Sequence, residues 1–161
     1  TLQTTVCTVF SSPRLYCGVG SPAGRALAFS PDGQFLATVS PSGTTGWLVR
    51  TWDRHTGREL HAGTLDEGQT QLAFTNDSRL ALLYRSGVQS TFSLWDARSD
   101  DRESEKALPT EEPPTLSPDG RRVAFMADGT LFIQNPHTGS ERKRPVPKGL
   151  GRLTFSENGQ A

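Results

Sequence analysis

The chain has 161 residues, a formal net charge of zero and a sequence pI of about 6.8. A balanced charge gives no global field that would draw the chain to nucleic acid or to an anionic membrane, so neither is an expected partner. No apolar stretch approaches the roughly 20 residues that a membrane span needs, and residues 1–20 lack the charged start and apolar core of a signal peptide.

Residues 1–20 predict a hairpin that turns at Ser11-Ser12-Pro13. Cys7 and Cys17 lie symmetrically about Ser12, so this hairpin places them on facing strands. A disulfide is conceivable, but facing strands hold their β-carbons about 4.5 to 5.5 Å apart, which is a little wide for an unstrained bond. We therefore expect two reduced thiols and keep the disulfide as the alternative.

One six-residue phrase occurs four times along the chain. The copies begin at Ala28, Ala73, Thr115 and Thr154, and successive copies are 45, 42 and 39 residues apart. A period of this size is that of a four-stranded propeller blade. The first and third copies contain Ser-Pro-Asp-Gly, in which Pro presets φ, Asp bonds back to the backbone and Gly accepts a positive φ. Each copy therefore predicts a turn that closes a hairpin.

The first three copies are followed by the same order of elements. An apolar strand comes first (35–39, 80–84 and 123–126), then a loop, and then another strand (47–53, 92–96 and 131–135). A second turn, which reads His-Thr-Gly in two of the repeats, leads to an outer strand. Apolar residues alternate or run in short blocks without a helical period, as strands do. The sequence therefore predicts an all-β propeller with four-stranded antiparallel blades at 26–65, 71–108 and 114–150.

The two ends of the chain fit the same register. Residues 1–20 align with the last two strands of a blade, and 151–161 align with the first strand of a further blade. One blade cannot bury both faces of its sheet, so blades must stack around an axis. We therefore expect a partial ring that belongs to a longer propeller of about seven or eight blades. The alternative is self-association that completes the ring.

The chain resembles the WD-repeat β-propellers through Trp52-Asp53 and Trp95-Asp96 at the ends of two strands, and through the Ser-Pro-Asp-Gly turns. The resemblance covers nearly the whole chain. It departs from the family because no Gly-His pair precedes the first strand of a blade and because Gln134-Asn135 replaces Trp-Asp in the third repeat. Residues 117–125 are equally similar to the repeats of periplasmic translocation and peptidase-associated propellers, so both families stay open, and WD-repeat is preferred.

Motifs for catalysis and cofactor binding are absent from the sequence, which has no nucleophile elbow, phosphate loop or dinucleotide fingerprint. His55 and His137 occupy one turn position in different repeats, and no Cys or carboxylate recurs at ligand spacing, so we expect no metal. His61 is expected to face solvent. The charged segment 98–114 predicts a solvated outer strand and loop, with an acidic docking strip as the alternative. The basic segment 141–148 is too short to argue nucleic-acid binding.

The resemblance also implies a binding surface. In WD-repeat propellers the loops that enter each blade, and the loops between its second and third strands, form one rim that commonly binds partners. By position, this rim carries five candidate partner-binding residues: Arg25, Trp47, Arg85, Gln89 and Asp128. Arg and aromatic side chains dominate interface hot spots, so Arg25, Trp47 and Arg85 lead this set. Trp47 also has an alternative role as an ordinary core residue of its strand.

We therefore expect a noncatalytic module that acts as a scaffold or sensor for a protein or peptide partner within a larger signalling protein. A cytoplasmic location is favoured, although the sequence does not determine it. The alternative is the propeller part of a hydrolase or other enzyme whose catalytic residues lie outside this segment. Neighbouring sequence, with further repeats or a catalytic motif, discriminates between the two.

Overall fold

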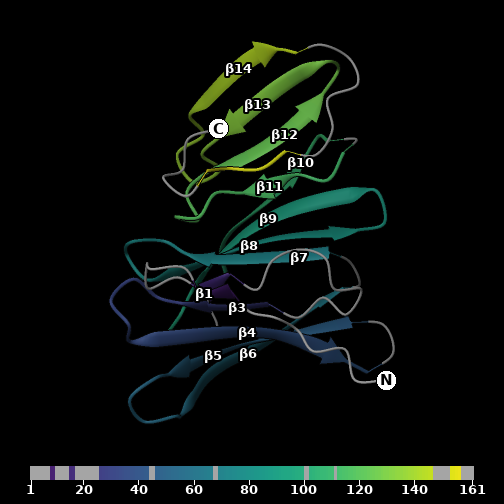
Figure 1. The fold of residues 1–161 in the computed structure, drawn as a ribbon. Helices are drawn as coiled ribbons and strands as arrows, with labels where there is room; N and C mark the ends of the chain where they lie inside the picture. The colour runs from purple at the N-terminus through teal and green to yellow at the C-terminus, as the bar shows by residue number, and fades with distance from the viewer. Residues whose placement is uncertain are drawn as a thin grey trace.

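The computed structural model describes residues 8–9, 15–16, 26–43, 46–66, 69–99, 102–110, 112–146 and 153–156. These residues form strands and turns only, which confirms the expected all-β class. Because the described residues include no helix, none of them forms a helix that could cross a membrane. Figure 1 shows the described strands gathered into separate sheets that are stacked one upon another.

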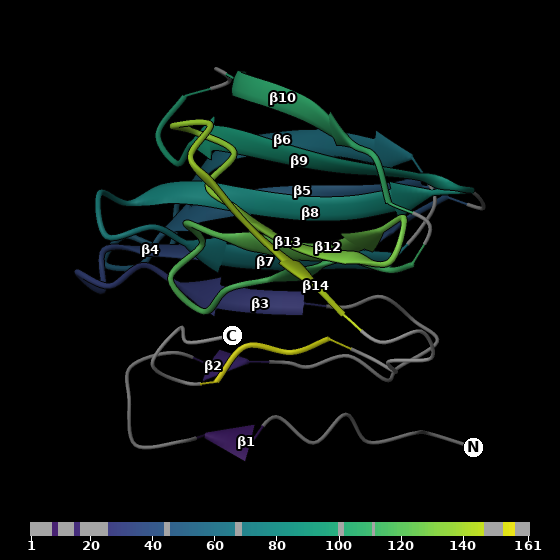
Figure 2. The same cartoon turned by 90° about the horizontal axis from the view of Figure 1, so that it is seen from above.

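Three sheets have four strands each, and in every sheet the strands are antiparallel neighbours in chain order. We call them the first, middle and third blades. The first contains β3 (Ala26–Phe29), β4 (Phe35–Ser42), β5 (Gly46–Asp53) and β6 (Glu59–Asp66). The middle contains β7 (Gln69–Phe74), β8 (Arg79–Ser86), β9 (Gln89–Asp96) and β10 (Arg102–Leu108), and the third contains β11 (Thr115–Leu116), β12 (Val123–Ala127), β13 (Thr130–Gln134) and β14 (Glu141–Pro145). Figure 2 shows the inner strands β3 and β7 on one side and the outer strands β6 and β10 on the other.

A two-stranded sheet precedes the blades. It consists of β1 (Thr8–Val9) and β2 (Leu15–Tyr16), and Thr8 pairs with Tyr16, as a hairpin centred on Ser12 requires. Residues 153–156 are described outside any strand, so the inner strand expected within 151–161 stays a prediction. Cys7 and Cys17 lie outside the described residues, and the expectation of reduced thiols stays a prediction too.

The turn between the first and second strands of a blade forms for a local reason. The hydroxyl of Ser30 donates to the carboxylate of Asp32 at 2.5 Å and accepts from the backbone N–H of Phe35 at 2.8 Å. Gly33 closes this turn with φ of 68°, in the left-handed region that glycine adopts without strain. The same hydroxyl-to-carboxylate bond recurs between Ser117 and Asp119 at 2.6 Å. The repeated phrase therefore encodes a repeated turn.

The core lies between the blades, in two clusters. The cluster between the first and middle blades is built mainly from alternate positions of β4, β7 and β8, and its buried members are Ala28, Phe35, Ala37, Val39, Val49, Leu65, Leu72, Phe74, Leu80, Leu82, Trp95 and Ala97. The cluster between the middle and third blades contains Ala73, Ala81, Leu83, Phe92, Leu94, Leu108, Leu116, Val123 and Phe125. Since β8 and β9 contribute to both clusters through alternate residues, the middle blade is buried on both of its faces.

Trp95 connects the first blade to the middle blade. Its indole is 2% exposed and lies against Gly63 of β6, where an added β-carbon would lie 2.7 Å from the ring. The ring of His61 packs edge-on against the same indole, with 5.4 Å between the ring centroids. The expectation that His61 faces solvent is therefore wrong. The sequence pattern missed this contact because an outer strand next to another blade has a covered face as well as a solvated one. The guanidinium of Arg102 lies over the indole at 5.0 Å.

Two polar bonds also join the first blade to the middle blade. The hydroxyl of Thr51 in the first blade donates to the backbone oxygen of Ala97 in the middle blade at 3.0 Å. Ser78, at the position that Gly33 has in the first blade, donates to Asp32 at 2.9 Å and has a φ of 61°. A left-handed φ is uncommon for a residue other than glycine, and here the side chain forms a bond that glycine lacks.

Candidate functional site

Three hairpins lie at the same edge of the stacked blades, because β4, β8 and β12 run toward the same side of the molecule (Figure 1). Their closing pairs are Ser42 with Gly46, Ser86 with Gln89, and Ala127 with Thr130. The residues after β10, 109–110 and 112–114, connect the middle blade to the third. We call the three hairpins and this connection the hairpin rim. It corresponds to the surface that the resemblance predicts for partner binding.

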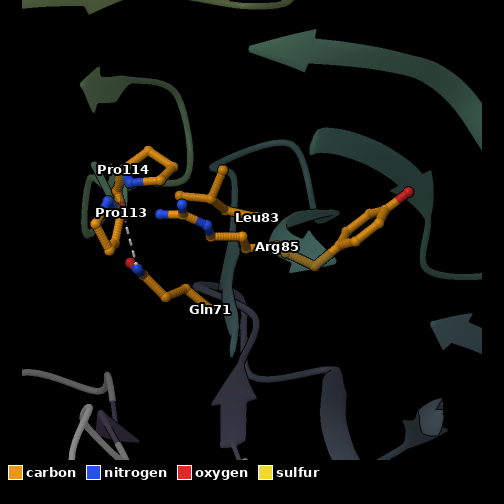
Figure 3. Close-up of a pocket in the computed structure, with 6 residues that line it drawn as sticks. Gln71, Leu83, Arg85, Pro113 and Pro114 are labelled. Carbon is orange, nitrogen blue, oxygen red and sulfur yellow. Dashed lines mark hydrogen bonds between the residues drawn. The ribbon is translucent and has the colours of Figure 1, made fainter. Parts of the chain in front are cut away.

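Arg85 is the candidate residue that the structure places most firmly on this rim. It is half-buried near the end of β8, and its Nε donates to the backbone oxygen of Gly87 at 3.1 Å. Figure 3 shows its side chain extending toward Pro113 and Pro114. It lines a recess whose other lining residues are Gln71, Leu83, Tyr84, Pro113 and Pro114.

Gln71 supports the wall of this recess. Its side-chain nitrogen donates to the backbone oxygen of Pro114 at 3.1 Å (Figure 3). Its side-chain oxygen accepts from the backbone N–H of Leu116 at 3.0 Å. One amide thus satisfies two backbone groups of the chain that enters the third blade. Because both bonds cross from β7 to the next blade, they fix the proline pair beside Arg85.

The recess is too small for a ligand of ordinary size. Its volume is about 10 Å³, which is room for about one water molecule. Small-molecule sites are clefts of several hundred Å³. The recess is therefore a shallow feature of the surface beside Arg85.

Tyr84 is held by a neighbour on the outer strand. Its hydroxyl donates to the carboxylate of Glu105 at 2.9 Å. Burial, with this hydrogen bond and the negative charge of Glu105, raises the pKa of Tyr84 to about 12. The phenol is therefore protonated at neutral pH and serves as a hydrogen-bond donor.

Gln89 and Asp128 are both exposed on the hairpin rim. The side-chain amide of Gln89 donates to the backbone oxygen of Ser90 at 3.2 Å. Asp128 has a φ of 50° and begins the two-residue turn that joins β12 to β13, a turn that needs positive φ at both positions. The turn geometry accounts for an Asp at this position, and the role of either residue in partner binding stays a prediction.

Trp47 is half-buried and packs against the cluster between the first and middle blades. Its indole Nε1 is buried and has no hydrogen-bond partner among the residues that the structure describes. These contacts support the alternative role that the sequence allows, a residue that belongs to the core, while its contact with a partner stays a prediction. Arg25, the fifth candidate, lies outside the described residues.

The opposite edge of the blades is occupied by internal bonds of the turns. The carboxylate of Asp53 accepts from the backbone N–H groups of His55 at 2.9 Å and Thr56 at 2.8 Å. These backbone bonds lower the pKa of Asp53. The side-chain oxygen of Asn135 accepts from His137 and its neighbour Thr138 in the same way. The two histidines thus occupy the same position of a repeated turn, to which each contributes its backbone N–H.

No group of three or more His, Cys, Asp or Glu side chains that could hold a metal ion occurs among the residues that the structure describes.

Sequence reasoning missed the part of the site that comes from the entry to the third blade. Gln71, Pro113 and Pro114 were not among the candidates. The available signal was an amide in the first strand of a blade, at the position where the first repeat has Ala26. That signal identifies a polar residue but not its bonds to Pro114 and Leu116, which depend on the packing of two blades.

Solved structures of other proteins are similar to this chain in fold. No family model and no curated protein matches the chain. Among solved structures, TolB from Acinetobacter baumannii matches with a TM-score of 0.51 and 22% identity, over 86% of this chain and 36% of that chain. U3-55K matches with a TM-score of 0.51 and 14% identity, over 81% of this chain and 42% of that chain. The β-propeller domain of Cps50 (Swd1) from Myceliophteria thermophila is a further match, with a TM-score of 0.39 and 14% identity over 88% of this chain and 61% of that chain.

The match thus covers less than half of the TolB chain and of the U3-55K chain. Sequence identities of 14% and 22% support a similarity of fold and nothing further. Together with the stacked four-stranded antiparallel sheets, the likenesses to TolB and U3-55K show that the chain has a β-propeller fold, present as a partial ring.

Proposed function

We propose that the chain is a WD-repeat β-propeller module that binds a protein or peptide partner through the hairpin rim. The sequence support for the WD-repeat family is the pair of Trp-Asp dipeptides at the ends of β5 and β9. In the first blade, the indole of Trp52 donates to the hydroxyl of Thr38 on the neighbouring strand at 3.3 Å. The similarity of residues 117–125 to translocation-type propellers keeps that family as the alternative.

The observation that carries the proposal is the setting of Arg85. An arginine is among the residues most often responsible for binding energy in interfaces, especially where surrounding groups exclude water from it. Arg85 is half-buried beside two prolines that the amide of Gln71 fixes in place. A partner therefore meets a cation whose surroundings are already ordered, which lowers the entropy cost of binding.

The proposed module has no catalytic step of its own and serves as a scaffold or sensor within a larger protein. The hairpin rim supports this role because its described features are a shallow recess and exposed polar side chains. Such a surface suits contact with a protein, whereas small substrates require a deeper cleft.

A peptide-display selection tests the proposal. Peptides selected on the full 161-residue chain are measured by fluorescence polarisation against the chain, the variant Arg85→Glu and the control variant Arg58→Glu. Arg58 is exposed on the opposite edge of the blades, away from the hairpin rim. Both variants replace an arginine with a glutamate, so they change the net charge equally. We expect Arg85→Glu to weaken binding about tenfold or more, while Arg58→Glu has little effect.

Trp47 is left unchanged in this test because its contact with the core would confuse lost binding with lost stability. Equal affinity of the selected peptides for the chain and for Arg85→Glu would remove the hairpin rim around Arg85 as the binding surface.

A further inference from the structure

The outer edge of the third blade differs from the outer edges of the other two. In β6 and β10 the pairing with the neighbouring strand is interrupted by a register shift, between Thr51 and Trp52 in the first blade and between Arg102 and Ser104 in the middle blade. β14 pairs with β13 in an unbroken register over all five of its residues. Irregularities of this kind protect a sheet edge from further pairing. β14 has no such irregularity, and its protection against self-pairing comes instead from its charged side chains and Pro145.

The ladder shows which backbone groups of β14 face outward. The backbone N–H of Asn135 donates to the oxygen of Ser140 at 2.8 Å, and that of Val146 donates to the oxygen of Gly129 at 3.1 Å. Because hydrogen-bonded pairs alternate along an antiparallel ladder, Arg142 and Arg144 direct their backbone groups inward to β13. Glu141 and Lys143 therefore direct an N–H and a C=O each to the free edge. Pro145 has no N–H and directs its C=O alone, so these groups are available to another strand.

The side chains give this edge a positive charge. All five residues of β14 are exposed. The one acidic residue, Glu141, is paired with Lys143 at 2.8 Å, and Lys143 also lies over the ring of Phe132 at 5.2 Å. Arg142 and Arg144 project on the opposite face of the sheet, beside Ile133 and Leu131. Within the described part of the chain, neither guanidinium forms an ion pair.

A second copy of this chain does not fit the edge. Two β14 strands would place their arginines near one another, and like charges across strands are destabilising. The acidic side chains of β10 are engaged already, because Glu103 pairs with Arg79 at 2.7 Å and Glu105 pairs with Arg102 at 3.2 Å. The same charges that oppose self-pairing favour a strand of the opposite sign.

We propose that β14 is a second binding surface, to which an extended acidic peptide of a partner protein adds as a fifth strand of the third blade. Its backbone pairs with the outward groups of Glu141, Lys143 and Pro145. Carboxylates at alternate positions of the peptide lie opposite Arg142 and Arg144, within reach of the guanidinium groups. This surface is separate from the hairpin rim, and the two fail or succeed independently.

Fluorescence polarisation with a labelled synthetic peptide of about eight residues, with Glu at alternate positions and Thr between, tests the proposal. The double variant Arg142→Glu/Arg144→Glu is compared with Arg58→Glu/Arg121→Glu, which makes the same charge change at two exposed arginines elsewhere. We expect the β14 variant to bind about tenfold or more weakly and the control to bind like the parent chain. Thermal unfolding of each variant shows that it is folded.

A second pair of variants tests the backbone contact. Lys143→Pro removes an outward N–H without breaking the ladder to β13, and Lys143→Ala removes the same charge but keeps that N–H. We expect Lys143→Pro to bind about fivefold more weakly than Lys143→Ala. Equal affinity of these two variants, equally tight binding of a peptide N-methylated on alternate amides, equal binding of a single-stranded oligonucleotide, or dimerisation of the chain through β14 would each overturn the proposal.

Discussion

In the middle blade, Phe92 and Leu94 on β9 are 2% and 3% exposed, whereas Leu131 and Ile133, at the aligned positions of β13, are only half-buried. The first pair is covered by the third blade, and the second pair faces away from the middle blade. The two strands have similar apolar side chains, and each is the third strand of its blade, between the second and the outer strand. The difference teaches that the position of a blade in the stack, more than its own sequence, determines how much of its surface is buried.

The polar contacts show the same contrast. Trp95 of the middle blade lies against Gly63 and under Arg102, and its indole nitrogen donates to the hydroxyl of Ser93 at 2.7 Å. At the aligned position of the third blade, Gln134 forms a bond of 3.5 Å to Glu141 of its own sheet. A residue that packs against the neighbouring blade thus has a counterpart whose hydrogen bond stays within its own sheet.

The largest expected effect comes from removing the side chain that connects two blades. Trp95→Ala leaves a cavity between the first and middle blades and should lower the free energy of unfolding by about 3–5 kcal/mol. Gln134→Ala, the control in the third blade, should cost about 1 kcal/mol. Urea unfolding followed by tryptophan-independent circular dichroism measures both. Similar losses for the two variants would contradict the difference between the blades.

A matched pair of apolar truncations sharpens the comparison. Leu94→Ala should cost about 3 kcal/mol because the side chain is enclosed, and Ile133→Ala about 1 kcal/mol because water already reaches part of it. The same urea titration measures the two values. A loss at Ile133 as large as that at Leu94 would mean that the outward face of the third blade is covered in solution.

Gly63→Ala tests the contact between β6 and Trp95. An added β-carbon lies 2.7 Å from the indole, so the blades must shift and the free energy of unfolding should fall by about 1–3 kcal/mol. In a double-mutant cycle the cost of Gly63→Ala should largely disappear in the Trp95→Ala background. Additive losses would show that the glycine is required for another reason.

The smallest expected effect is on the stability of the fold at low pH, through the carboxylate of Asp32. Partial burial opposes ionisation of Asp32, but bonds from Ser30, Gln34 and Ser78 outweigh it and lower the pKa of Asp32. A carboxylate with a lowered pKa stabilises the fold above its unfolded value, near 3.8, and this contribution is lost as the pH falls through the folded pKa. Asp32→Asn should therefore show a smaller decrease in melting temperature than the parent chain between about pH 5 and 2.5.

Ser78→Ala serves as the companion variant, since it removes the bond from the middle blade to Asp32 and leaves the local turn intact. Its melting temperature at neutral pH should be lower than that of the parent chain. Parallel acid curves for the parent chain and Asp32→Asn would show that Asp32 does not contribute to the connection between blades.

The sequence allowed the blades to be predicted because their turns are local. Ser30 and Asp32 bond within a few residues, so the phrase that contains them indicates a hairpin wherever it recurs. Contacts between blades could not be predicted in this way. The fit of Trp95 against Gly63 and the bonds of Gln71 join residues more than thirty positions apart, and their geometry depends on how two sheets stack.

The residues of the candidate site also separate into those that local repeats predict and those that depend on the packing of blades. Arg85, Gln89 and Asp128 could be assigned to one rim because hairpin order follows from the repeat register. The proline pair beside Arg85 could not, since it enters from the connection to the next blade. Trp47 shows that residue type alone does not separate an interface residue from a core residue, because both roles favour a large ring.

Hydrogen exchange of the full chain, resolved to individual strands by mass spectrometry, tests the central difference between the blades most directly. Local opening is easiest where few apolar contacts oppose it. We predict that the amides of β8 and β9, buried on both faces, exchange at least about tenfold more slowly than those of β12 and β13. Equal protection of the two pairs of strands, or stronger protection in the third blade, would contradict this account.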